Sequence, residues 1–83
     1  MNCIIIDDDK LSCKVVGEFV KKTSSLTLIG AFSDSIEARN ILTKRKDIDL
    51  LFLDIEMPEM DGFEFIKSLD NPPNIIIISS GEA

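Results

Sequence analysis

The chain has 83 residues, of which 45% are hydrophobic and 29% are charged, which predicts one small folded domain rather than a multidomain enzyme or a disordered segment. No apolar run approaches the roughly 20 residues that a membrane-spanning helix needs. Nine basic and 15 acidic residues give a net charge of −6, which disfavours binding to nucleic acid and favours cations or basic partner surfaces.

Four short apolar runs recur along the chain at intervals of 23 to 25 residues. They are residues 3–6, 26–29, 50–53 and 75–78. Each run has the length of a strand, and three are apolar without interruption, which is typical of strands buried on both faces of a parallel sheet. The segments between the runs are long enough to hold helices.

The segment between the first two runs has the pattern of an amphipathic helix. Its apolar residues recur at spacings of three to four, and lysines occupy other positions around the helix. We therefore predict a helix over residues 10–22 whose apolar side faces the sheet. The apolar residues of this pattern are Leu11, Val15, Val16, Phe19 and Val20.

Two further helices are predicted from their end signals. Asp34 lies three residues before Glu37, as in a capping box, and the basic residues 44–46 suit the C-terminus of the same helix. A third, shorter helix begins after Asp61 and is ended by the Asn-Pro-Pro sequence of residues 71–73. The apolar residues of the third helix are Phe65, Ile66 and Leu69.

Strands and helices alternate along the chain, which implies parallel strands joined by right-handed crossovers. The predicted fold class is α/β, an open doubly wound parallel sheet of the flavodoxin-like kind with strand order 2-1-3-4. In this order the first helix lies on one face of the sheet and the other two lie on the opposite face. One helix covers about two strands, so we expect strands three and four to be bare beside the first helix. We therefore also expect a homodimer or larger assembly through the uncovered sheet.

Acidic residues follow two strands that are neighbours in this order. Asp7, Asp8 and Asp9 follow the first strand, and Asp54 follows the third, at the crevice where ligands bind in such sheets. Carboxylates placed together there repel one another unless a cation neutralises them, and oxygen ligands suit Mg²⁺. Capping of the first helix is the simpler explanation for the three successive aspartates taken alone. Asp54 directly follows four apolar strand residues, so its carboxylate is expected to be buried at a cost in free energy that helix capping does not require. This favours a functional role for Asp54.

The sequence contains no histidine, so any chemistry rests on carboxylates and hydroxyls. Cys3 and Cys13 match no metal-binding spacing and are expected to be buried thiols in a reducing compartment. The first residues show neither the basic flank nor the long apolar core of a secretory signal. We therefore expect a cytoplasmic location.

The segment from Asp54 to Gly62 reads Asp-Ile-Glu-Met-Pro-Glu-Met-Asp-Gly. Together with Asp7 and Asp8, it closely resembles the receiver domain of bacterial two-component response regulators, and the resemblance extends over essentially the whole chain. Residues 2–8 and 71–78 are most similar to receivers that precede LytTR-type DNA-binding domains.

This resemblance implies a phospho-accepting receiver that is not itself an enzyme. It would take a phosphoryl group from a sensor histidine kinase and relay the signal to an output domain or partner. The resemblance implies that Asp54 is the phospho-acceptor, that Asp8 binds Mg²⁺ directly and that Asp7 binds it through water. Glu56 would offer its backbone carbonyl to the metal. Ser80 resembles the hydroxyl residue that binds a phosphoryl oxygen, with ordinary strand-end hydrogen bonding as the alternative.

Complete receivers continue past the fourth strand through a helix, a fifth strand that ends near a functional lysine, and a last helix. The resemblance therefore implies that residues 1–83 are the N-terminal portion of a receiver domain, without that lysine.

Two alternatives to a receiver remain open. A haloacid-dehalogenase-type phosphatase also uses a strand-end aspartate with Mg²⁺, but it requires Asp-x-Asp where this chain has Asp54-Ile55-Glu56. A non-switching interaction or dimerisation module built on the receiver scaffold is the more serious alternative. Uptake of a phosphoryl group separates both from the receiver hypothesis.

Overall fold

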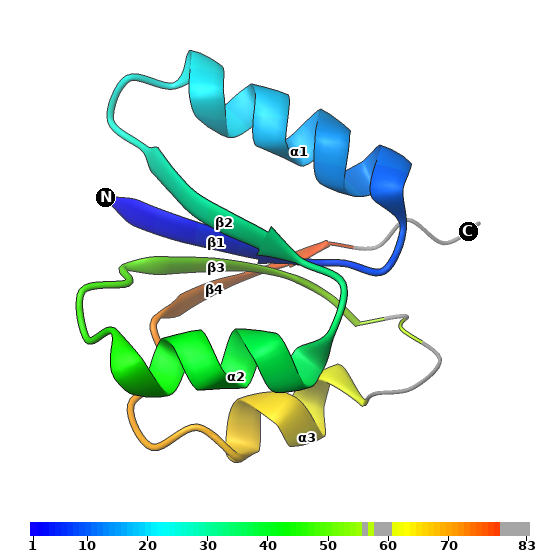
Figure 1. Cartoon of the computed structure of the whole chain (residues 1–83), viewed down its shortest axis with the longest axis vertical. Helices are drawn as coiled ribbons and strands as arrows, with labels where there is room; N and C mark the ends of the chain where they lie inside the picture. The colour runs from blue at the N-terminus through cyan, green and yellow to red at the C-terminus, as the bar shows by residue number, and fades with distance from the viewer. Residues whose placement is uncertain (56, 58–60, 79–83) are drawn as a thin grey trace.

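The computed structural model describes residues 1–55, 57 and 61–78, which form a parallel sheet with helices on both faces (Figure 1). The strand order is β2-β1-β3-β4, with every neighbouring pair parallel. This order confirms the predicted α/β fold. The elements in chain order are β1 (Asn2–Ile6), α1 (Lys10–Lys22), β2 (Thr27–Phe32), α2 (Ser35–Lys44), β3 (Leu50–Asp54), α3 (Gly62–Lys67) and β4 (Asn74–Ile78).

An aspartate caps the start of each helix. The side chains of Asp9, Asp34 and Asp61 each accept a hydrogen bond from the backbone N–H two residues further on. These bonds satisfy N–H groups that have no partner inside the helix. The predicted starts of all three helices are thus confirmed, and Asp9 is the capping residue among the three successive aspartates.

The sheet separates two hydrophobic clusters. α2 and α3 lie on one face and α1 lies on the other, as Figure 1 shows. Leu51 and Leu53 belong to the cluster with α2 and α3, whereas Leu50 and Phe52 belong to the cluster with α1. β3 is buried along its whole length, so the expectation that it is bare beside α1 is wrong. The side chains that pack in the cluster with it on this face include Val16, Val20 and Ile78.

β4 is an edge strand with partly exposed apolar side chains. Ile76 and Ile77 are 46% and 43% exposed, and successive side chains of a strand point to opposite faces. The expectation of an open apolar edge is therefore confirmed for β4 in the described part of the chain.

α1 turns a different side toward the sheet than its apolar pattern predicts. Leu11, Val15 and Phe19 are 59% to 69% exposed, so three of the five predicted core residues lie outside. The thiol of Cys13 donates a hydrogen bond to the carbonyl of Asp7 at 3.2 Å, which fixes the inward side near the start of the helix. The buried residues of the helix, four and seven positions further on, are Gly17 and Val20.

β2 and α3 differ in extent from the predicted elements. β2 spans Thr27–Phe32 rather than residues 26–29, and its register with β1 shifts at a bulge that leaves Ile29 as the extra residue. Pairing with β1 holds Gly30 in the strand despite the low strand propensity of glycine. α3 ends at its cap before Leu69, which packs against the core from the following loop.

Substitution by alanine is expected to have opposite effects on stability at Gly62 and at Gly17. A β-carbon at Gly62 would lie 2.9 Å from Cγ2 and 3.2 Å from Cα of Ile55, whereas one at Gly17 would lie 3.7 Å from the side chain of Leu28. We expect Gly62→Ala to destabilise the fold by about 1 to 3 kcal/mol through overpacking. We expect Gly17→Ala to stabilise it by about 1 kcal/mol through helix propensity. Urea unfolding measures both, and shifts of the same sign would contradict this account.

Candidate acidic site

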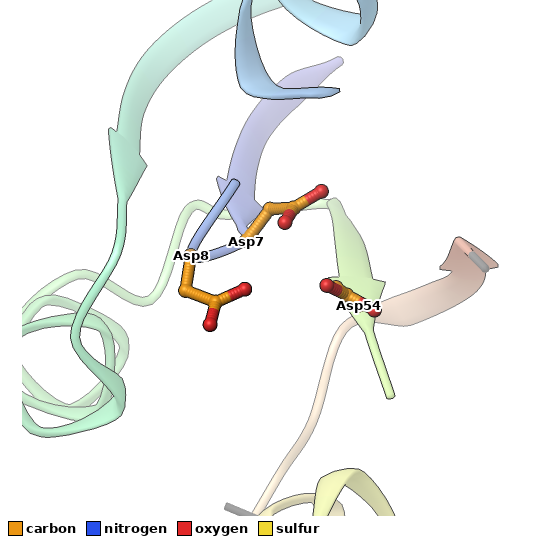
Figure 2. A group of neighbouring side chains, drawn as sticks. All are labelled: Asp7, Asp8 and Asp54. Atoms are coloured by element: carbon orange, nitrogen blue, oxygen red, sulfur yellow. The ribbon is translucent and has the colours of Figure 1, made fainter. Parts of the chain in front are cut away.

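Three aspartates meet beyond the carboxyl ends of β1 and β3. Asp54 is the last residue of β3, and Asp7 and Asp8 directly follow β1. Because β1 and β3 are parallel neighbours, their carboxyl ends share one edge of the sheet. One carboxylate oxygen from each residue lies within 4.8 Å of the other two. Figure 2 shows the carboxylates of Asp8 and Asp54 directed toward each other, with Asp7 beside them.

Burial makes this cluster electrostatically costly. Asp7 is 0% exposed and Asp54 is 1% exposed, whereas Asp8 is open to solvent. Oδ1 of Asp7 accepts a hydrogen bond from the backbone N–H of Asp9 at 2.9 Å. Its buried Oδ2 has no hydrogen-bond partner in the described part of the chain. Burial and the nearby Asp54 carboxyl raise the pKa of Asp7 to about 6, although the Asp9 N–H acts in the opposite direction.

The donor set suits a small divalent cation. Carboxylate oxygens are hard ligands, and Mg²⁺ characteristically binds one or two carboxylates while it keeps water or phosphate in other positions. The buried Oδ2 of Asp7, which has no hydrogen-bond partner among the described residues, is the kind of oxygen that a cation or a proton satisfies. Solvent reaches the cluster at Asp8, so a further ligand can approach from that side.

The structure brings together only part of the predicted site. Asp7, Asp8 and Asp54 converge, whereas Glu56 and Ser80 lie outside the described residues, so their roles stay predictions. Cys13 is a neighbour of the site that the sequence analysis did not foresee, because its thiol bonds to the backbone of Asp7. Burial raises the pKa of this thiol, so it is a neutral hydrogen-bond donor rather than a nucleophile.

Sequence comparison assigns the chain to a family. The model of the response regulator receiver domain matches residues 3–83. The chain belongs to the response regulator receiver family. An uncharacterized response regulatory protein from Shewanella oneidensis is 33% identical over 82 residues, which are 96% of this chain and 34% of that protein. A protein-glutamate methylesterase/protein-glutamine glutaminase from Methylobacillus flagellatus is 37% identical over 79 residues, which are 93% of this chain and 22% of that protein.

Solved receiver structures share the fold. The isolated receiver domain of RcsB from Salmonella enterica serovar Typhimurium, in the presence of phosphomimetic BeF3⁻, has a TM-score of 0.85 and 27% identity. That comparison covers 100% of this chain and 64% of the other. A chain in the crystal structure of the P1 domain of CheA3 in complex with CheY6 from R. sphaeroides has a TM-score of 0.81 and 32% identity, and the comparison covers 96% of this chain and 64% of that one.

The receiver family fixes the general function of the chain. It is a phospho-accepting receiver of two-component signalling, and the phosphatase alternative is inconsistent with this assignment. The chain spans about a third or less of the length of the curated relatives described above. The LytTR subtype stays a prediction. No helix in the described part of the receiver is long and apolar enough to cross a membrane.

Proposed function

We propose that Asp54 is the residue of this receiver that takes the phosphoryl group, and that a sensor histidine kinase donates it. The observation that carries the proposal is the convergence of the Asp54 carboxylate with those of Asp7 and Asp8 at the end of a buried strand. An oxygen of Asp54 attacks phosphorus and forms an acyl phosphate. The bond from phosphorus to the donor imidazole nitrogen breaks, and that nitrogen keeps the bonding electron pair.

We propose that Asp7, Asp8 and Asp54 hold Mg²⁺, with the backbone carbonyl of Glu56 as a further ligand and Asp7 acting through water. Bound there, Mg²⁺ supplies positive charge that offsets the charge of the transferring phosphoryl group. The chain itself fixes the nucleophile on a rigid strand and leaves the cluster open to the donor at Asp8. Ser80 is proposed to bind a phosphoryl oxygen.

Reaction with a small phosphodonor tests the proposed function. With acetyl phosphate and Mg²⁺, we expect intact-mass spectrometry to show one added phosphoryl group, and borohydride trapping with peptide mapping to locate it on Asp54. A chelator should abolish the product. A product on a serine, or one that forms equally well with chelator, would contradict the assignment. No product at all would favour the interaction-module alternative.

We also propose that two copies associate through β4. Ile76 and Ile77 expose apolar surface on both faces of this edge, and the backbone of an open edge pairs readily with another strand. Light scattering at micromolar concentration is expected to show a dimer, and Ile76→Lys with Ile77→Lys is expected to give monomers. A well-folded monomer of the unmodified chain would contradict this proposal.

A further inference from the structure

A groove of about 520 Å³ runs along α1 and the edge strand β2. It lies on the face of the sheet opposite α2 and α3, because α1 occupies that face (Figure 1). Its volume falls within the range of pockets that bind ligands. The apolar lining includes Gly17 of α1 and Leu28 and Ala31 of β2. The lysines that line it are Lys10, Lys14 and Lys21.

These lysines concentrate positive charge in an acidic chain. Three of the nine basic residues line one groove of a chain whose net charge is −6. The acidic residues of the lining are Glu18 and, near the site, Asp7. None of the three lysines forms an ion pair among the residues described, where the ion pair present joins Arg45 and Asp47. Their charges are therefore available to a partner.

Gly17 lines the groove, although the fold does not require glycine at this position. Glycine inside a helix is less stable than alanine. None of the described glycines has a positive φ, and a β-carbon at Gly17 would meet the side chains of Leu28 and Ile5 at 3.7 and 4.0 Å, which are ordinary contacts. Neither backbone conformation nor packing demands glycine here. Its effect is to keep the backbone of α1 close to Leu28, where the helix and β2 border the groove.

We propose that this groove binds an acidic, partly apolar segment of a partner protein. Carboxylates of the segment pair with the three lysines, and its apolar side chains lie on Leu28 and Ala31. A helix rises 1.5 Å per residue, so the lysines extend over roughly 16 Å, the span of about five extended residues. The apolar side chains between the lysines favour a peptide over nucleic acid, because a phosphate backbone has no apolar groups to place on Leu28 and Ala31. The proposal does not depend on phosphorylation of Asp54.

Fluorescence anisotropy with a labelled peptide of about ten alternating glutamate and leucine residues tests the proposal. We expect saturable binding that weakens as salt is added. Lys14→Gln with Lys21→Gln should weaken binding about tenfold, because two charge pairs are lost. The matched control, Lys44→Gln with Lys67→Gln, removes the same charge from the ends of α2 and α3 and should change binding less than about twofold.

Gly17→Leu is an independent test, since the leucine side chain would occupy part of the groove. It should weaken peptide binding to a similar extent. Circular dichroism checks its fold, and the lysine variants decide the matter if it does not fold. The proposal is overturned by an absence of binding or by equal losses in the two lysine pairs. It is also overturned if a peptide of glutamate alone, or one of glutamine and leucine, binds equally well. Tighter binding to RNA or to anionic phosphatidylserine vesicles would overturn it too.

Discussion

Asp54→Asn is expected to abolish uptake of the phosphoryl group, with a loss of about a thousandfold or more in rate. An amide cannot form the acyl phosphate, whereas asparagine keeps the size of the side chain and much of its hydrogen-bonding capacity. The fold of the variant should therefore persist, and unfolding curves can verify this. The measurement is the rate of mass gain with acetyl phosphate and Mg²⁺.

Asp70→Asn is the matched control for this prediction. Asp70 is an exposed carboxylate between α3 and β4, so it precedes β4 and lies toward the opposite end of the sheet from the acidic cluster. The same change of charge there should leave the rate of phosphoryl uptake unaltered. Persistent uptake by Asp54→Asn, or an equal loss in both variants, would show that another residue accepts the group.

The second large effect concerns Asp7 and the stability of the metal-free chain. Folding raises the pKa of Asp7 from 3.8 to about 6, so between these values the folded state holds a proton that the unfolded state has lost. The stabilising contribution is complete below the unfolded pKa, and it is lost as the pH rises through the folded pKa. At neutral pH the ionised, buried Asp7 costs about 3 kcal/mol of unfolding free energy.

Asp7→Asn should remove this cost. Asparagine keeps an oxygen to accept the bond from the Asp9 N–H and carries no charge. In chelator, the variant should match the unmodified chain near pH 4 and exceed its stability by about 3 kcal/mol near pH 7. Added Mg²⁺ should stabilise the unmodified chain near pH 7 more than the variant, which lacks one of the three carboxylates. Urea unfolding across this range measures both effects.

The exposed Asp8 supplies the control for the pH dependence. Asp8→Asn removes a charge from the same cluster without relieving burial, so between pH 4 and pH 7 its stability relative to the unmodified chain should change by less than that of Asp7→Asn in chelator. A difference between Asp7→Asn and the unmodified chain that is the same near pH 4 and near pH 7 would disprove the role given to Asp7.

The arrangement of the acidic cluster could be predicted because it follows from topology. Four apolar runs separated by helical segments predicted the strand order, and that order alone places Asp7, Asp8 and Asp54 at one edge. The different structural roles of the three successive aspartates could not be predicted. Capping by Asp9 and convergence of the other two depend on where the first turn of α1 begins.

The orientation of α1 and the course of β2 could not be predicted from the sequence, for related reasons. Leu11, Val15 and Phe19 satisfy a helical apolar pattern as well as the buried residues do, so the pattern does not identify the inward side. The bulge at Ile29 belongs to the pairing with β1, which is a tertiary property. The groove lined by Lys10, Lys14 and Lys21 lies where α1 passes β2, so it could not be predicted either.

The two edge strands of the described sheet differ in regularity, which bears on the proposed association of copies. β4 pairs with β3 in unbroken register, whereas β2 carries the bulge at Ile29. A bulge interrupts the row of backbone groups that an incoming strand would use. Polymerisation strand by strand requires a receptive edge on each side of every subunit. Joining of two β4 edges, as proposed above, would use the regular edge of both copies and leave the bulged β2 edges, so we expect association through the described part of the sheet to stop at a dimer.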